Sequence, residues 1–350
     1  FWLKFAQSFP TVPLPATSMR VCLTVALSVA ATEPLRIKGV LPAVFTPFSD
    51  DGQSLNTEVI PKFAQYLNAT GVEYVFVAGT TGESLSLTMT ERMALTEAWA
   101  KQGMKVITHV GAESLLDAKA LAAHAQDNGA VALGCMPPVF FKPANVSMLA
   151  KWLQEVGAAA PKLPLYYYHI PSMTGVEFMM LDLIKEVEKL GVPTFAGVKY
   201  TGLYEPRSFM DFEQCSEYAG GKYEILCGRE EMSAQALAVG AQGFIGSQFN
   251  FAADLYEELA RRFPTQDYLA VQDRALALLN AWGGGSVGVN GNKQVMEFVG
   301  LGMGGARLPS VDASKADVAA QQQRLRAWCT ETKKAIHFEP HMCQQSSVVV

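Results

Sequence analysis

The sequence predicts a (β/α)8 TIM barrel followed by a C-terminal helical extension. Short β-rich runs alternate with segments of helical periodicity from Gly39 onward, and this alternation stops near residue 256. Eight strand candidates, with helices between them over about 215 residues, fit such a barrel. A doubly wound sheet is the alternative, but it would call for a glycine-rich turn after the first strand, and Thr46–Gly52 is not one. The candidate strands begin near Val40, Tyr74, Lys105, Ala130, Leu165, Phe195, Tyr223 and Gly243.

The predicted helices have recognisable ends. Gly71 stops the first helix, and Gly129 stops the third, which runs over residues 114–128. Thr88 and Glu91 have the spacing of a capping box at the start of the second helix. The apolar residues of the first helix fall on one stripe, as expected for a helix that covers a sheet: Val59, Ile60, Phe63, Tyr66 and Leu67.

Composition and periodicity divide the chain into four parts. These are an N-terminal arm or signal segment (1–38), the catalytic barrel (39–256), a C-terminal helical extension (257–335) and a disordered tail (336–350). Helices are expected in the extension near 265–282, 291–299 and 315–334.

Composition also limits the partners and the compartment. The 350 residues are 49% hydrophobic and 17% charged, which is typical of a globular protein. The net charge of −5 and the lack of a basic cluster argue against nucleic acid as a partner. No apolar run reaches the roughly 20 residues of a membrane helix. The six cysteines are scattered and are expected to be free thiols of a cytoplasmic protein, although residues 19–30 resemble a secretory signal peptide and leave export open.

Lys199 is the candidate nucleophile. The apolar run Phe195–Thr201 predicts a strand that is covered on both faces, with this lysine near its carboxyl end. Burial would lower the pKa of the amine, and a neutral amine attacks carbonyl groups to form a Schiff base. The alternative is a structural lysine whose ammonium group reaches solvent.

Other polar residues follow neighbouring strands, where a barrel places its chemistry. Thr80 and Thr81, in the segment Gly79–Ser84, form a candidate carboxylate cradle or an ordinary polar turn. Tyr168 is a candidate proton relay or a packing residue, and His169 is expected to be structural.

Acidic residues end the seventh predicted strand. Glu230 and Glu231 could bind the hydroxyl groups of a polyol, or could stabilise the start of the next helix, and Ser247 ends the eighth strand. Within the barrel no metal-ligand spacing occurs, so we expect neither a metal nor another cofactor. The segment Gly300–Gly305 matches a dinucleotide fingerprint, but it follows a predicted helix instead of a strand, and we interpret the match as accidental.

The order and spacing of these motifs resemble those of a known family. Over residues 38–310 the chain is similar to the pyruvate-dependent class I aldolases of the N-acetylneuraminate lyase and dihydrodipicolinate synthase family. The resemblance rests on Gly79–Glu83, Tyr168–Pro171, Gly197–Lys199 and Gly246–Ser247. Three further segments resemble the animal-type N-acetylneuraminate lyases: Phe140–Pro143, Tyr166–Pro171 and Arg307–Pro309.

The resemblance implies a role for each candidate residue. Lys199 would form the Schiff base with pyruvate, Tyr168 would move the proton of the substrate hydroxyl, and Thr80 with Thr81 would hold the carboxylate. The residues that would contact the sugar chain are Thr201, Gly228, Glu230, Glu231 and Ser247. The implied reaction is the reversible cleavage of N-acetylneuraminate (sialic acid) to pyruvate and N-acetylmannosamine by a homo-oligomer, a tetramer or a dimer.

Two departures from the synthase pattern affect the choice of substrate. Where the synthase branch has an arginine for a second carboxylate, this chain has Met173, and where it lends a tyrosine across a subunit contact, this chain has Phe140. Arg229 is unfamiliar between Gly228 and Glu230. The alternatives are 2-keto-3-deoxygluconate aldolase, dihydrodipicolinate synthase and a sugar-acid sensor that has lost catalysis.

Overall fold

The barrel predicted from the sequence is present in the computed structural model, which describes residues 35–202, 205–265, 267–283 and 293–345. Eight parallel strands form one sheet in the order β1-β8-β7-β6-β5-β4-β3-β2. The ends of this order meet, because Ala43 pairs with Phe76 in parallel and Val44 N donates to Phe76 O at 3.1 Å. The sheet is therefore a barrel and not a doubly wound sheet. The strands are β1 (Gly39–Pro42), β2 (Tyr74–Val77), β3 (Lys105–His109), β4 (Ala130–Cys135), β5 (Leu165–His169), β6 (Phe195–Tyr200), β7 (Glu224–Cys227) and β8 (Gly243–Gly246).

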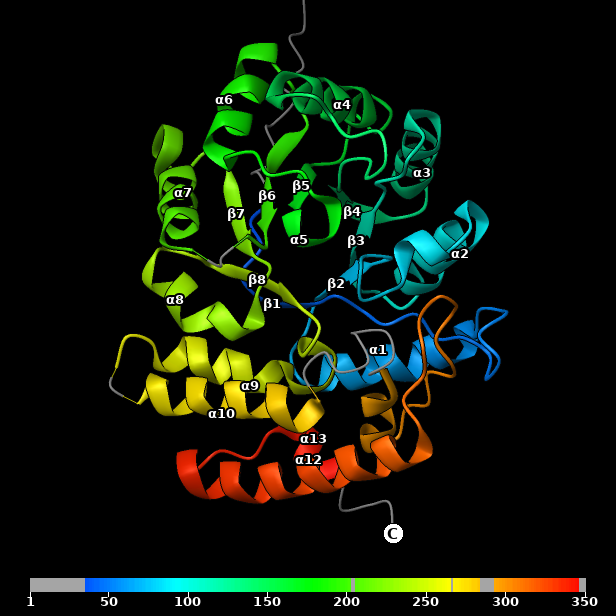
Figure 1. Cartoon of the computed structure of the whole chain (residues 1–350), viewed down its shortest axis with the longest axis vertical. Helices are drawn as coiled ribbons and strands as arrows, with labels where there is room; N and C mark the ends of the chain where they lie inside the picture. Colours follow the sequence, from blue (N-terminus) through cyan, green and yellow to red (C-terminus); the bar gives the residue numbers. More distant parts are fainter. Residues whose placement is uncertain (1–34, 203–204, 266, 284–292, 346–350) are drawn as a thin grey trace, which may run out of the picture. The chain divides into compact units, whose positions relative to one another are not determined.

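Helices alternate with the strands, and a further group follows the barrel (Figure 1). The α-helices are α1 (Ile60–Ala69), α2 (Met89–Ala100), α3 (Leu115–Asp127), α4 (Val146–Ala158), α5 (Pro171–Thr174), α6 (Met180–Leu190), α7 (Pro206–Glu217), α8 (Ser233–Ala238), α9 (Phe249–Arg262), α10 (Tyr268–Trp282), α12 (Lys315–Ile336) and α13 (His341–Gln345). The 3-10 helices are η1 (Thr57–Val59), η2 (Ser84–Ser86), η3 (Tyr218–Gly220), η4 (Glu230–Met232) and η5 (Lys293–Val299). The predicted barrel boundary at residue 256 falls inside α9, the helix that follows the eighth strand.

The helix ends follow local sequence signals. The predicted capping box of α2 is confirmed: Thr88 N donates to Glu91 Oε2 at 2.8 Å, and Glu91 N donates to Thr88 Oγ1 at 3.2 Å. Gly71, which follows α1, has a φ of 83°, a left-handed conformation that glycine adopts without strain. The stripe predicted for α1 faces the core, with Ile60, Phe63, Ala64, Tyr66 and Leu67 buried.

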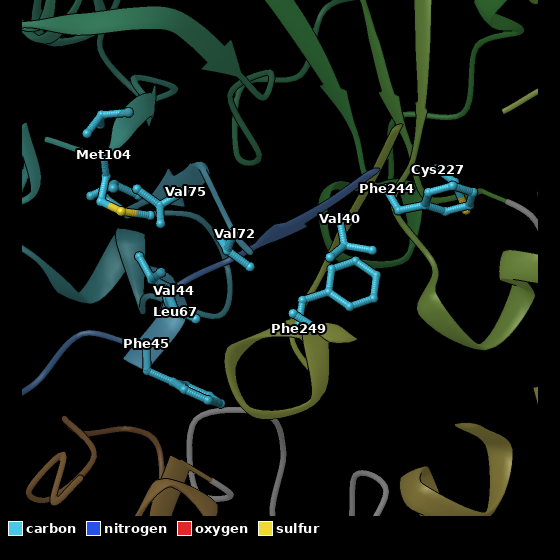
Figure 2. Packing of buried hydrophobic residues seen from close by; sticks show 14 of the residues in the cluster. Val40, Val44, Phe45, Leu67, Val72, Val75, Met104, Cys227, Phe244 and Phe249 are labelled. Carbon is cyan, nitrogen blue, oxygen red and sulfur yellow. The ribbon is translucent and has the colours of Figure 1, made fainter. Parts of the chain in front are cut away.

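Two hydrophobic clusters lie on opposite faces of the strands. Alternation sends Leu41 into the cluster inside the barrel and Val40 into the cluster between strands and helices. Figure 2 shows Val40 in this outer cluster together with Phe249 of α9. The inner cluster contains Tyr166, Tyr168 and Phe76, so it forms the base on which polar groups at the carboxyl ends of the strands rest.

The C-terminal extension is a layer of helices on one side of the barrel. In Figure 1, α10 lies between α9 and α12. Side chains of α12 fix it to α10, because Gln321 Nε2 donates to Trp282 O at 2.7 Å and Trp328 Nε1 donates to Arg274 O at 2.9 Å. The third predicted helix of this region is confirmed as α12. The helix predicted at 291–299 is the 3-10 helix η5 over its described part.

The predictions of a disordered tail and of free thiols both need correction. Within residues 336–345, α13 is an ordered helix with Met342 buried. Cys329 of α12 and Cys343 of α13 form a disulfide across a Cα–Cα distance of 5.6 Å. The sequence could not reveal this pair, because only the turn of the chain after α12 brings the two cysteines together. Cys135, Cys215 and Cys227 are buried free thiols.

Two predictions on the ends of the chain fall outside the described residues. These are the signal-like segment at 19–30 and the last five residues of the tail. Among the described helices, none is long and apolar enough to cross a membrane.

Candidate active site

A cavity of about 310 Å³ lies at the carboxyl ends of the barrel strands. Every site residue predicted from the sequence lines it: Thr80, Thr81, Tyr168, Lys199, Thr201, Gly228, Glu230, Glu231 and Ser247. These residues come from the ends of β2, β5, β6, β7 and β8 or from the loops that follow them. The barrel thus brings together side chains that are up to 167 positions apart, from Thr80 to Ser247.

Lys199 is buried at the end of β6, with 3% of its surface exposed. Its Nζ lies 4.2 Å from the centre of the Phe76 ring and 3.9 Å from that of the Tyr168 ring. Burial lowers the pKa of Lys199 to about 7, and the nearby Glu230 carboxylate opposes this shift in part. A large fraction of the amine is therefore neutral near pH 7, as a nucleophile requires. The alternative of a lysine that reaches solvent does not fit this burial.

Tyr168 is the tyrosine of its run that reaches the cavity. The strand alternates, so Tyr166 points to the same interior but lies two residues deeper, where its hydroxyl donates to Glu224. Tyr167 belongs to the outer cluster. The Tyr168 hydroxyl lies 3.2 Å from Thr80 Oγ1. Burial raises the pKa of Tyr168 to about 12, so its hydroxyl keeps its proton at neutral pH.

The loop after β2 presents two hydroxyl groups. Thr80 contacts Tyr168, and Thr81 Oγ1 lies 2.8 Å from Ser247 Oγ. The loop is a compact turn, because Glu83 N donates to Thr80 O at 3.0 Å. Hydroxyl groups from the ends of three strands, β2, β5 and β8, thus converge in the cavity that Lys199 also lines.

Glu230 lines the cavity, and its carboxylate is bound to the backbone of the protein. Its Oε1 accepts hydrogen bonds from Ser247 N at 2.8 Å and Gln248 N at 3.1 Å. Burial raises the pKa of the Glu230 carboxyl, and Glu231 raises it further. The sequence left open whether Glu230 binds the hydroxyl groups of a polyol or stabilises the start of the helix after β7. In the structure its carboxylate binds the backbone of a different turn, the one between β8 and α9.

Glu231 and Arg229 form an ion pair, with 3.4 Å between Glu231 Oε1 and Arg229 Nη1. Gly228 is required by close packing, since a Cβ there would lie 2.4 Å from Thr201 Cγ2. Thr201 Oγ1 donates to His169 O at 2.8 Å. The unfamiliar Arg229 is thus the ion-pair partner of Glu231. The other two contacts hold Gly228 and Thr201 in place at the rim of the cavity.

His169 has a structural environment, as expected. Its ring lies 4.8 Å from the Tyr200 ring, and burial lowers the pKa of His169 to about 4, so the imidazole is neutral. Met173 and Phe140, the two departures from the synthase pattern, are 66% and 79% exposed and do not line the cavity.

Several lining residues were not predicted from the sequence. Leu279 and Trp282 come from α10, beyond the barrel, and Ser172 comes from α5. No motif marks Leu279 and Trp282, because they reach the cavity only through the packing of α10 beside the barrel. The other unpredicted lining residues are Ala43, Ile170, Arg229, Ile245 and Gly246.

The segment Gly300–Gly305, whose match to a dinucleotide fingerprint we interpret as accidental, has a packing role. A Cβ at Gly304 would lie 2.0 Å from Phe48 O, so this glycine allows the extension to approach the loop after β1. Within the described residues, no group of three or more His, Cys, Asp or Glu side chains could hold a metal ion.

A (β/α)8 barrel with a buried lysine at the carboxyl ends of its strands is the architecture of the class I aldolases, which are lyases. The chain belongs to the dihydrodipicolinate synthetase family, whose sequence profile matches residues 36–327.

Among the proteins similar to this chain are N-acetylneuraminate lyases from animals and bacteria. The chain is 35% identical over 302 residues to N-acetylneuraminate lyase of Mus musculus, covering 83% of this chain and 92% of the mouse protein. It is 36% identical over 301 residues to N-acetylneuraminate lyase of Danio rerio, covering 82% and 95% of the two chains. The solved structure of Proteus mirabilis N-acetylneuraminate lyase superposes with a TM-score of 0.78 at 32% identity, covering 84% of this chain and 99% of that one.

Proposed function

We propose that the enzyme is an N-acetylneuraminate lyase, which cleaves N-acetylneuraminate reversibly to pyruvate and N-acetylmannosamine. The observation that carries the proposal is the Lys199 amine, buried at the cavity and with a pKa lowered to about 7. The similarity to the mouse, zebrafish and Proteus lyases supports the choice of substrate.

Lys199 would act as the nucleophile. Its neutral Nζ attacks the keto carbon of the substrate, and loss of water leaves a protonated Schiff base. This iminium accepts the electron pair of the carbon–carbon bond as the bond breaks, so the product is an enamine and not a free carbanion. Protonation of the enamine carbon followed by addition of water releases pyruvate and restores the amine.

Tyr168 would relay the proton. In cleavage its hydroxyl accepts the proton of the substrate hydroxyl while its own proton passes to the carboxylate group of the keto acid, which Thr80, 3.2 Å from the Tyr168 hydroxyl, would hold. In the synthetic direction the same protons move back, so Tyr168 donates to the aldehyde oxygen and is reprotonated from that carboxyl group. The proximity of Tyr168 to Lys199 supports this role, since Nζ lies 3.9 Å from the tyrosine ring centre.

Thr80 and Thr81 would bind the carboxylate of the keto acid. Their hydroxyl groups contact Tyr168 and Ser247. A carboxylate bound to them would lie next to the keto carbon that Lys199 attacks. Contacts with the sugar chain would come from the rim, where Glu231 supplies a half-buried carboxylate and Ser247 a hydroxyl group. The remaining sugar contacts would be Thr201, Gly228 and Glu230.

Dihydrodipicolinate synthase is the related alternative. Its aldehyde partner carries a carboxylate, which calls for a cation in the outer cavity. The cation that lines this cavity besides Lys199 is Arg229, and it is paired with Glu231. A polyhydroxylated chain fits two glutamates and a serine better, because carboxylates accept strong hydrogen bonds from hydroxyl groups.

We also propose that the enzyme is a homo-oligomer, a dimer or a tetramer, and that it takes small-molecule substrates and no nucleic acid. The exposed pair Phe140 and Phe141, whose rings are 5.0 Å apart, supports contact with another copy. For the compartment, the scattered cysteines favour the cytoplasm, whereas the Cys329–Cys343 disulfide favours an oxidising compartment. Cell fractionation with detection of the oxidised and reduced chains decides between them.

A single assay tests the proposed reaction. Purified enzyme is incubated with N-acetylneuraminate, and pyruvate release is followed with a coupled reductase. We expect release of one pyruvate per N-acetylmannosamine formed. Pyruvate consumption with aspartate semialdehyde, in place of this cleavage, would assign the chain to the synthase reaction.

A further inference from the structure

A fully buried ion pair connects the C-terminal extension to the loop after β2. Lys293 of η5 and Glu83 lie 3.0 Å apart between Nζ and Oε1, and both side chains have 0% exposure. Among the ion pairs of the described residues, this is the one in which both partners are completely buried. Lys293 and Glu83 do not line the active-site cavity.

Glu83 is the last residue of the loop that carries Thr80 and Thr81. Its two carboxylate oxygens accept from different parts of the extension, Oε1 from Lys293 Nζ and Oε2 from Arg307 N at 3.0 Å. Its own backbone N donates to Thr80 O at 3.0 Å. The residue whose carboxylate binds the extension is thus also hydrogen-bonded, through its backbone, to the backbone of Thr80 in the candidate carboxylate cradle.

Lys293 also holds the other side of this loop. Its Nζ donates to Thr46 O at 3.2 Å, and Thr46 Oγ1 donates to Gly82 O at 2.7 Å. The ammonium group lies 4.4 Å from the centre of the Phe48 ring. Both routes from Lys293, through Glu83 and through Thr46, therefore end on the segment that follows Thr80 and Thr81.

A buried ion pair of this kind contributes little to the free energy of unfolding. Desolvation of two charges offsets much of their attraction, and apolar residues of similar volume often stabilise a core as well or better. Charge-assisted hydrogen bonds do, however, fix direction, because each donor and acceptor must be met. The buried charges therefore favour one defined position of the loop that carries Thr80 and Thr81.

We propose that Lys293, through Glu83, is a positioning residue for the carboxylate cradle formed by Thr80 and Thr81. The inference rests on the proposed function, since it assumes that the cradle binds the carboxylate of a keto acid. Loss of a hydrogen bond to a charged group such as this carboxylate weakens binding about 10–10²-fold. Loss of the pair should therefore weaken keto-acid binding while Lys199 keeps its own chemistry.

The test uses the full-length chain and measures the pyruvate concentration that half-saturates borohydride trapping on Lys199. For Lys293→Met we expect this concentration to rise about 10–10²-fold, with the trapping rate at saturating pyruvate changed far less. The control is Lys222→Met, which removes an exposed ion pair with Glu188 and should leave both values as in the wild type. Unchanged half-saturation in folded Lys293→Met overturns the proposal.

A second variant separates positioning from stability. Lys293→Met leaves the Glu83 carboxylate buried and unpaired, which destabilises the fold, whereas Lys293→Met with Glu83→Leu removes both charges. The double variant should regain thermal stability, yet it should keep the raised half-saturating concentration, because Arg307 N and Thr46 O have lost their partners. Recovery of wild-type pyruvate binding, or failure of the double variant to fold, would assign the pair to stability and overturn the proposal.

The proposed function and this inference fail in different ways. If the wild type forms no adduct with pyruvate, the proposed lyase chemistry is wrong. If the wild type and Lys222→Met form the adduct and Lys293→Met binds pyruvate equally well, only the positioning role is wrong.

Discussion

Lys199 and Tyr168 are register partners on β6 and β5, and Lys199 Nζ lies 3.9 Å from the centre of the Tyr168 ring. The pairing of two parallel strands sets this geometry, so the proposed nucleophile and the proposed proton donor are held together by rigid elements. The aromatic rings around the amine also remove water from it, which lowers the pKa of Lys199. One relationship thus accounts for both the position and the reactivity of the lysine.

The first prediction concerns the site of covalent attachment. Pyruvate with borohydride should inactivate the enzyme and add one reduced pyruvyl group to Lys199, because its amine is the buried one at the cavity. Peptide mapping by mass spectrometry locates the adduct. Lys199→Ala should remain folded and unlabelled at this peptide, and an adduct on a different lysine would contradict the assignment.

The second prediction is the pH dependence of adduct formation. Since burial lowers the pKa of Lys199 to about 7, the neutral fraction of the amine should rise through this pH and level off about one to two units above it. The initial rate of trapping at low pyruvate, measured across this range, should follow that curve. A rate that keeps rising toward the ordinary lysine value of 10.5 would mean that the amine is not desolvated.

The same shift makes a prediction about stability. The pKa of Lys199 in the folded state lies below its ordinary value of 10.5, so between about 7 and 10.5 the unfolded chain holds more protons and stability rises with pH. The lysine therefore destabilises the fold most below about pH 7. Lys199→Met should raise the melting temperature near pH 6, and this gain should shrink toward pH 10.

Thermal scans of both proteins at each pH give the difference directly. Lys222→Met is the control, since the Lys222 amine is exposed and its interaction with Glu188 raises its pKa to about 12. A gain for Lys199→Met that grows with pH would have the wrong sign and would reject the buried charge.

The third prediction separates Schiff-base formation from bond cleavage. Tyr168→Phe should still form the pyruvate adduct but should lower the rate of cleavage about 10²–10⁴-fold, the usual contribution of an acid–base group. Rapid-quench trapping measures the first step and pyruvate release the second. Tyr167→Phe, in the outer cluster, should leave the rate of cleavage close to that of the wild type. Near-native cleavage by Tyr168→Phe would assign the relay to another group.

The sequence predicted the barrel and its site for a physical reason. A parallel barrel places each strand end at the same face, so Lys199, Tyr168 and Thr80 could be brought together without knowledge of any contact. Successive side chains of a strand alternate between its faces, so Tyr167 points outward while Tyr168 points into the barrel.

The contacts that the sequence did not predict depend on the packing of helices outside the strand–helix repeat of the barrel. Leu279 and Trp282 reach the cavity from α10, and Lys293 reaches Glu83 from η5, after the strand–helix alternation has ended. The disulfide of Cys329 and Cys343 forms only because the chain turns back after α12. Such contacts are set by helix docking, which leaves no periodic signal in the sequence.

The fourth prediction concerns this disulfide. A cross-link between residues 14 positions apart closes a loop for which the chain-entropy model gives about 3 kcal/mol. Cys343→Ser should lower the free energy of unfolding by about 2–4 kcal/mol, as measured by denaturant titration, and should leave catalysis unchanged because the cavity is elsewhere. Dithiothreitol should lower the stability of the wild type to a similar extent and have little effect on the variant. Equal stability of the oxidised wild type and the variant would show that the cross-link constrains little.

The last prediction concerns the outer cavity and the choice of substrate. Lys199 would act on any keto acid, so discrimination must come from groups beyond the carboxylate cradle. Glu231 is the carboxylate at the rim, with Arg229 3.4 Å away, and Glu231→Gln keeps its shape while it removes the charge. A charge-assisted hydrogen bond is worth about 1.5–3 kcal/mol, or roughly 10–10²-fold in kcat/KM.

We therefore expect Glu231→Gln to lower kcat/KM for N-acetylneuraminate by about this factor and to leave the half-saturating pyruvate concentration in borohydride trapping unchanged. The matched control is Glu188→Gln, which removes a carboxylate that is paired with Lys222 and does not line the cavity. The wild type should also cleave N-acetylneuraminate with a higher kcat/KM than 2-keto-3-deoxygluconate, because the longer hydroxylated chain reaches Glu231 and Ser247. A preference for the shorter substrate, with Glu231→Gln equally active on both, would make the enzyme a keto-deoxy-sugar-acid aldolase instead.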